Sequence, residues 1–100
     1  MPRLRSVAEV ATPRAARWAK QLVSHLGRRL AGSLDEVTGV GLLSGDGFGA
    51  TLTPTTDTLV LEAWADDEES MSRVTSVIGS HLERFAAASE ELTVEWRAQP

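Results

Sequence analysis

The two histidines are the side chains best suited to chemistry in this 100-residue sequence, which contains no cysteine and no tyrosine. His25 and His81 each stand in the tripeptide Ser-His-Leu. Imidazole changes its charge near neutral pH and is the commonest metal ligand among side chains. If the fold brings the pair together, we expect a weak divalent-metal site or a polar anchor for a ligand. The simpler alternative is two semi-buried histidines, each with a structural hydrogen bond.

Neither histidine has a second metal ligand at helical spacing on its own segment. The sequence contains neither His-x-x-x-His nor Glu-x-x-His, and Glu83 diverges from His81 on a helix because it is two residues away. A metal site at His25 and His81 therefore needs two helices side by side and a carboxylate or water from elsewhere. A small enzyme is a further alternative, with either histidine as general base. It requires a carboxylate within hydrogen-bond reach of the imidazole.

Trp18 and Gln21 precede His25 by seven and four positions, so a helix places all three residues near one side. A tryptophan, an amide and an imidazole around a groove suit a small ligand, and they equally suit a dimer contact. We predict a ligand site in a groove between two helices. His25 and His81 are its expected polar anchors, with Trp18 and Gln21 beside His25.

The composition is that of an ordinary globular domain, with 42% hydrophobic and 24% charged residues. No apolar run reaches the roughly 18 residues that a membrane helix needs, and residues 1–5 lack the apolar core of a secretion signal. We expect a loose tail at residues 1–5 and one domain at residues 6–98. The expected protein is cytoplasmic and makes no membrane contact.

Basic groups are concentrated in the first third of the chain. Residues 1–33 hold seven basic groups and one acidic group, whereas residues 34–100 hold three basic and thirteen acidic groups. A basic arm for nucleic acid is one interpretation. Because the whole chain carries a formal charge of −4, we expect instead that the basic segment lies against acidic segments of the same domain. No nucleic-acid partner is predicted.

Two amphipathic helices should position the histidines. The first is expected to begin with Thr12 as N-cap and Pro13, and to extend to the Gly-Ser pair at 32–33. The second begins with capping-box spacing between Asp66 and Glu69 and should end near residue 87. Each helix has one apolar stripe, formed by Ala15, Ala19, Leu22, Val23, Leu26 and Leu30 in the first and by Met71, Val74, Ile78, Leu82 and Phe85 in the second.

Strands are expected around the helices. Residues 7–11 form a weak edge strand, a hairpin turns at 45–47 within residues 34–53, and residues 58–64 form the clearest strand. Apolar and polar side chains alternate in the last strand, residues 91–97, with Leu92, Val94 and Trp96 on one face. The expected fold is α+β: a mainly antiparallel four- or five-stranded sheet with both helices on one face, in the order (β)-α-β-β-β-α-β.

Two side chains test the assignment of the second helix. Leu82 lies at the centre of its apolar stripe, so Leu82→Ala should lower the free energy of unfolding by about 2–5 kcal/mol. Glu90 lies on a predicted loop, so Glu90→Ala should change it by no more than about 0.5 kcal/mol.

Four stretches of the sequence carry a family resemblance. The run at 13–25 contains the pattern Trp-x-Lys-Gln-Leu-x-x-His, and His-Leu-Glu-Arg-Phe occurs within residues 80–86. Together with residues 57–65 and 91–96, these runs resemble the opening helix, closing helix, central strand and last strand of domain-of-unknown-function family 2218. This is a family of small bacterial proteins, and the likeness extends over about residues 7–97.

The resemblance implies a biological setting and no reaction. Members of this family have no assigned reaction and occur alone, or joined to or encoded near siderophore-interacting flavoproteins. The chain is therefore expected to be an uncharacterised accessory or binding module linked to siderophore and iron use, with such a flavoprotein as a partner. Residues 44–49 depart from the Phe-Pro-x-Gly that the family usually shows, so no ligand contact is carried over there. A homodimeric interaction module without a small-molecule site is a further alternative.

Overall fold

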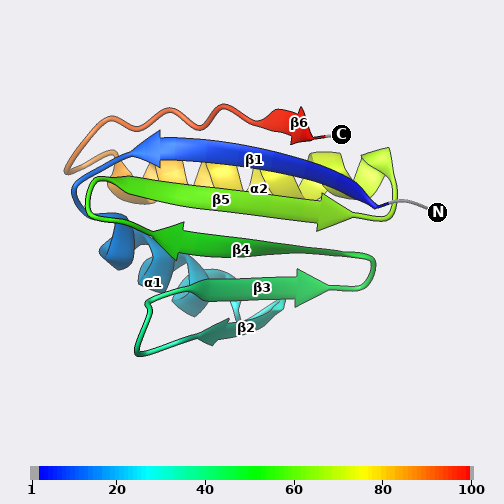
Figure 1. Ribbon diagram of the computed structural model, residues 1–100, viewed down its shortest axis with the longest axis horizontal. Coiled ribbons are helices and arrows are strands. Elements are labelled where there is room, and N and C mark those ends of the chain that lie inside the picture. Colours follow the sequence, from blue (N-terminus) through cyan, green and yellow to red (C-terminus); the bar gives the residue numbers. More distant parts are fainter. Residues whose placement is uncertain (1–2, 100) are drawn as a thin grey trace.

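Six antiparallel strands form one sheet, and both helices cover the same face of it (Figure 1). The structure is a computed structural model that describes residues 3–99. The strands are β1 (Leu4–Ala11), β2 (Ala31–Leu34), β3 (Gly41–Gly45), β4 (Phe48–Pro54), β5 (Thr58–Ala65) and β6 (Arg97–Gln99), and the helices are α1 (Ala15–Leu26) and α2 (Glu68–Ala86). Their order in the sheet is β2-β3-β4-β5-β1-β6. The predicted α+β class is confirmed, and the sheet has six strands in place of the four or five expected.

The alternation of side chains along β5 decides which face of the sheet the helices cover. Leu59, Leu61, Ala63 and Ala65 are buried, while the residues between them are partly or fully exposed. β5 pairs with β1 on one side and with β4 on the other, so this alternation is continued by buried residues of both neighbours. The opposite face of the sheet remains open, as one-sided burial of antiparallel strands allows.

The apolar stripes of both helices pack on that buried face, as predicted. The buried helical residues are Ala15, Trp18, Ala19, Leu22 and Leu26 of α1 and Val74, Ile78, Gly79, Leu82 and Ala86 of α2. Full burial of one leucine contributes about 1.5–3 kcal/mol, so these stripes hold the helices on the sheet. Leu82 is fully buried, as the prediction for Leu82→Ala requires, whereas Phe85 is only partly buried.

β1 is longer and more central than the weak edge strand expected at residues 7–11. It begins at Leu4 and pairs with β5 over eight residues, so Leu4 and Arg5 belong to the sheet and not to a loose tail. Met1 and Pro2 lie outside the described residues. The inward side chains of β1 include Ser6 and Ala8, which have a low preference for strands. The strand is stabilised instead by pairing with β5 on one side and β6 on the other.

The first helix is shorter than predicted. α1 ends at Leu26 with Gly27 as its C-cap, and the chain then turns into an additional strand, β2, that pairs with β3. A Cβ at Gly32 would lie 3.0 Å from the Cα of Gly27, so two glycines allow β2 to pass close to the helix end. Thr12 also does not cap the helix directly. Its hydroxyl accepts from the backbone N–H of Arg14 in the turn that precedes α1.

Two features near α2 also differ from the sequence-based expectation. The N-cap is Asp67, one residue later than predicted, and its carboxylate accepts from the Ser70 backbone N–H at 2.7 Å. The segment at 91–96 is not paired as a strand, because its apolar side chains pack toward α2. A Cβ at Gly79 would lie 3.5 Å from the indole of Trp96. Only β6, at the end of this segment, pairs with β1.

Candidate groove between the two helices

The two helices differ in length, and this difference opens a groove on the covered face of the sheet. α1 has 12 residues and α2 has 19, which correspond to about 18 Å and 28 Å of helix. The chain turns away after Leu26, so the N-terminal half of α2 is left without a neighbouring helix. A cavity of about 700 Å³ lies there, bordered by α1, α2 and the β3–β4 turn, and we call it the α1–α2 groove. This volume is within the usual range for small-molecule sites.

The α1–α2 groove combines an apolar lining with basic groups. Its apolar side chains are Leu26, Leu30, Phe48, Val74, Val77 and Ile78. Its basic side chains are His25, Arg28, Arg29, Arg73, His81 and Arg84. Asp46 is the one carboxylate among the lining residues that the structure describes, so four arginines face one carboxylate around the groove in a chain that is acidic overall.

The arginines of the groove are largely available to a ligand. Arg73 is ion-paired with Glu69 at 2.8 Å, and both side chains are mostly exposed. Within residues 3–99, no carboxylate lies within ion-pair distance of Arg28, Arg29 or Arg84. A guanidinium presents a planar set of donors that matches a carboxylate or phosphate, so these side chains favour an anionic ligand.

The fold brings the two histidines together at one end of the groove. The ring centroids of His25 and His81 are 5.4 Å apart, with 49° between the ring planes. The ring of Phe85 packs edgewise against both, at 5.0 Å and 5.9 Å. The Nδ1–H of His81 donates to the carbonyl of Val77 at 2.7 Å, since a carbonyl oxygen can only accept. The predicted approach of the histidines is thus confirmed, and the orientation of His81 is set by its own helix.

Sequence reasoning placed two other residues beside His25, and neither lines the groove. Trp18 is 2% exposed and belongs to the hydrophobic core, so its expected ligand-binding role is replaced by a structural one. Gln21 is exposed on α1, outside the residues that border the cavity. Trp18 therefore faces the core, whereas His25 borders the groove at the C-terminal end of α1.

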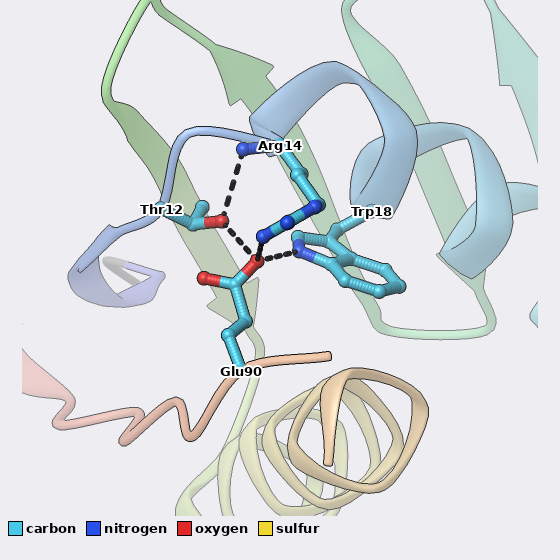
Figure 2. A network of polar contacts seen from close by, with 4 residues as sticks. All are labelled: Thr12, Arg14, Trp18 and Glu90. Carbon is cyan, nitrogen blue, oxygen red and sulfur yellow. Dashed lines mark hydrogen bonds and ion pairs between the residues drawn. The ribbon is translucent and has the colours of Figure 1, made fainter. Parts of the chain in front are cut away.

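The indole of Trp18 takes part in a polar network at the opposite end of α1 (Figure 2). One oxygen of Glu90 accepts from the Trp18 indole N–H at 3.0 Å, the Thr12 hydroxyl at 2.9 Å and the Arg14 guanidinium at 3.0 Å. The network fastens the segment after α2 to the N-terminal end of α1. Glu90 lies outside the helices and strands, as predicted, but its side chain is only 15% exposed and accepts from three donors, so we expect a larger effect of Glu90→Ala than the loop position suggested.

The network also determines the ionisation of Glu90. Desolvation by burial acts to raise the pKa of this carboxyl, but the hydrogen bonds from Trp18, Thr12 and Arg14 outweigh it and hold the pKa below its usual value. Every partner is more than 70 residues away in the sequence, so no local pattern could have revealed the contact.

The α2 side of the groove, by contrast, could have been recognised in the sequence. Its residues follow one another at spacings of four, four and three, which place them on one face of a helix: Arg73, Val77, His81 and Arg84.

Several basic groups of the first third of the chain pair with later acidic ones, as the charge distribution suggested. Arg3 lies near Asp66, Arg5 near Glu62 and Arg14 near Glu90, at 3.8, 3.4 and 3.0 Å. Among the basic groups of this segment that have no ion pair within residues 3–99, Arg28 and Arg29 border the groove.

Two chemical interpretations can be compared with the geometry. In the described part of the chain, neither histidine is hydrogen-bonded to a carboxylate, which is the contact that a general-base role requires. Residues 3–99 also contain no cluster of three or more histidine, aspartate or glutamate side chains arranged to hold a metal ion.

Neither of the two helices is long and apolar enough to cross a membrane.

Comparison with known proteins gives the family. The model of the family described as "Uncharacterized protein conserved in bacteria (DUF2218)" matches residues 7–97. The chain belongs to the DUF2218 family. The match covers the range over which the sequence resemblance was recognised, including both histidines. Among curated proteins, none matches the chain.

A solved structure supports the fold of this DUF2218 protein. The NMR structure of PA4090 from Pseudomonas aeruginosa is similar to it, with a TM-score of 0.75 and 28% sequence identity. The similarity covers 94% of this chain and 95% of PA4090, so the two proteins share their whole architecture.

Proposed function

We propose that this protein is a small-molecule binding module that holds an organic acid with an apolar body in the α1–α2 groove. The observation that carries the proposal is the combination of six apolar side chains with four arginines and two histidines around one cavity of about 700 Å³. Apolar lining surface favours a hydrophobic body, and the arginines favour an acidic group at its end.

The position of the charges supports an elongated ligand. Arg73 and Arg84 are 11 residues apart on α2, which is about three turns or roughly 16 Å along the same side of the helix. Val77 lies between them, and its side chain is 38% exposed. A ligand that covers Val77 would remove this apolar surface from water while its acidic group meets a guanidinium.

The experiment compares 2-naphthoate with its neutral counterpart 2-naphthalenemethanol by isothermal titration calorimetry. We expect 2-naphthoate to bind more tightly, and its affinity to fall as salt is added because the contact is electrostatic. Arg28→Ala and Arg84→Ala should each weaken it several-fold. Val77→Asp should abolish it, since it places a carboxylate on the apolar lining beside the acidic ligand.

Arg97→Ala is the matched control, because Arg97 is an exposed arginine of β6 outside the groove. It should leave the binding of 2-naphthoate unchanged. Equal affinities for the acid and the alcohol would contradict the proposal, and so would undiminished binding by Val77→Asp. Urea unfolding of each variant separates loss of the site from loss of the fold.

The link to siderophore and iron use, and to a siderophore-interacting flavoprotein as partner, is a proposal that the sequence resemblance supports. A pull-down of such a flavoprotein from the same genome with wild-type protein tests it, with loss of capture by Val77→Asp expected if the groove is involved. The general-base alternative requires a carboxylate hydrogen-bonded to His25 or His81, and none is present within residues 3–99.

A further inference from the structure

The separation of the two imidazoles matches that of two ligands on one metal ion. Two imidazoles bound to a tetrahedral Zn²⁺, with Zn–N bonds of about 2.0–2.1 Å, place their ring centroids about 5 Å apart. The observed separation between His25 and His81 is 5.4 Å. Each ring also packs edgewise against Phe85, which lies beside the pair.

The hydrogen bond of His81 leaves the appropriate atom free. Its Nδ1–H is donated to the Val77 carbonyl, so in the neutral ring the lone pair is on Nε2. A backbone carbonyl that accepts the second ring N–H is the usual support of a metal-binding histidine, because it sets the tautomer and the ring orientation.

The protein supplies only part of a coordination shell. Zn²⁺ takes four ligands, and within residues 3–99 no third histidine or carboxylate completes the pair. Glu83 is committed elsewhere, since its carboxylate accepts from the Val94 backbone N–H at 3.0 Å. The nearby groove arginines repel a bare cation but attract an anion that carries or meets one.

We propose that His25 and His81 bind a divalent transition-metal ion such as Zn²⁺ with two coordination positions open toward the α1–α2 groove. An acid that chelates through two adjacent oxygens fills those positions, so the metal and the acid bind together more tightly than either binds alone. This inference rests on the proposed function, because the same groove holds the apolar body of the acid, and it narrows the ligand to a chelating acid.

The test uses salicylate, which chelates through its carboxylate and ortho-hydroxyl, and its isomer 4-hydroxybenzoate, which cannot. Calorimetric titrations of wild-type protein are run with each acid, with and without Zn²⁺, and corrected for the binding of Zn²⁺ to the acid in buffer. We expect Zn²⁺ to raise the affinity for salicylate at least tenfold and to leave the affinity for 4-hydroxybenzoate unchanged.

His25→Ala and His81→Ala should each remove the gain from Zn²⁺. Ser24→Ala and Ser80→Ala change the neighbouring exposed residues of the same two tripeptides and should retain it. Long-range ¹H–¹⁵N NMR spectra of the wild-type protein provide a readout independent of any variant, in which Zn²⁺ with salicylate should shift the Nε2 resonance of His81.

The outcomes separate this inference from the proposed function. If Zn²⁺ gives salicylate no gain, or if the gain persists in both histidine variants, the metal site is wrong. Binding of 2-naphthoate without metal then still upholds the acid-binding groove. If 2-naphthoate fails to bind and salicylate does not bind with Zn²⁺, both proposals are wrong.

Discussion

The two ends of α1 arrange polar groups in opposite ways. At the N-terminal end, the Glu90 carboxylate accepts hydrogen bonds from three side chains of the same chain (Figure 2). At the C-terminal end, Arg28 and Arg29 border a cavity together with two histidines and have no ion pair in the described structure. Satisfied polar groups stabilise a fold, whereas basic groups gathered beside an apolar cavity without partners leave their hydrogen-bonding capacity for a ligand.

The largest effect should come from the network end. Trp18→Ala should lower the free energy of unfolding by about 3–5 kcal/mol, because it removes a buried aromatic side chain from the core. Urea denaturation measures it. Trp18→Phe is the matched control, since it keeps most of the packing and loses only the N–H donated to Glu90, and its cost should be clearly smaller. Equal costs would mean that the hydrogen bond dominates over the packing.

Glu90→Ala should lower the free energy of unfolding by about 1–3 kcal/mol, because the buried indole N–H of Trp18 and two other donors lose their acceptor. This replaces the near-zero effect expected from the loop position. Glu91→Ala changes the adjacent exposed carboxylate and should stay within about 0.5 kcal/mol. If the two variants have the same urea midpoint, the network is not stabilising.

The pH dependence of stability should report the same carboxylate. The pKa of Glu90 is lowered in the folded state, so its contribution is present above the unfolded pKa of about 4.3 and is lost as the pH falls through the folded value. Backbone hydrogen bonds also lower the pKa values of Asp35 and Asp67 in the folded protein. The contributions of these two carboxylates to the stability of the fold are therefore also lost at acidic pH. Comparing wild-type protein with Glu90→Gln from pH 6 to pH 3 isolates Glu90. The variant should show the shallower decline, and parallel curves would contradict the assignment.

The smallest effect on stability should come from the groove end. Arg28→Ala should change the free energy of unfolding by no more than about 0.5 kcal/mol, because the guanidinium is exposed and has no ion pair in the described chain. Arg14→Ala, at the other end of α1, removes an ion pair with Glu90 and should cost more. Thermal melts of both variants test the comparison directly. A larger loss for Arg28→Ala would show that the groove arginines are structural.

Local patterns in the sequence determined the secondary structure of most of the chain. The apolar stripes of α1 and α2 and the alternation of β5 each reflect one residue period and one buried face, so their positions could be predicted from the sequence. Predictions failed where tertiary pairing outweighs local preference: β1 is held by two neighbouring strands, and the segment at 91–96 finds its partners on α2.

The candidate site, like the fold, has parts that could be predicted from the sequence and parts that depend on tertiary packing. The sequence alone identified His25, His81 and the helices that carry them, because both the residue types and the helical periodicity are local properties. The 5.4 Å approach of the rings, the groove and the capture of Glu90 by Trp18 depend on where α1 ends and on how it lies against α2. Such contacts join residues more than 50 positions apart, and only packing of the whole chain sets the distance between them.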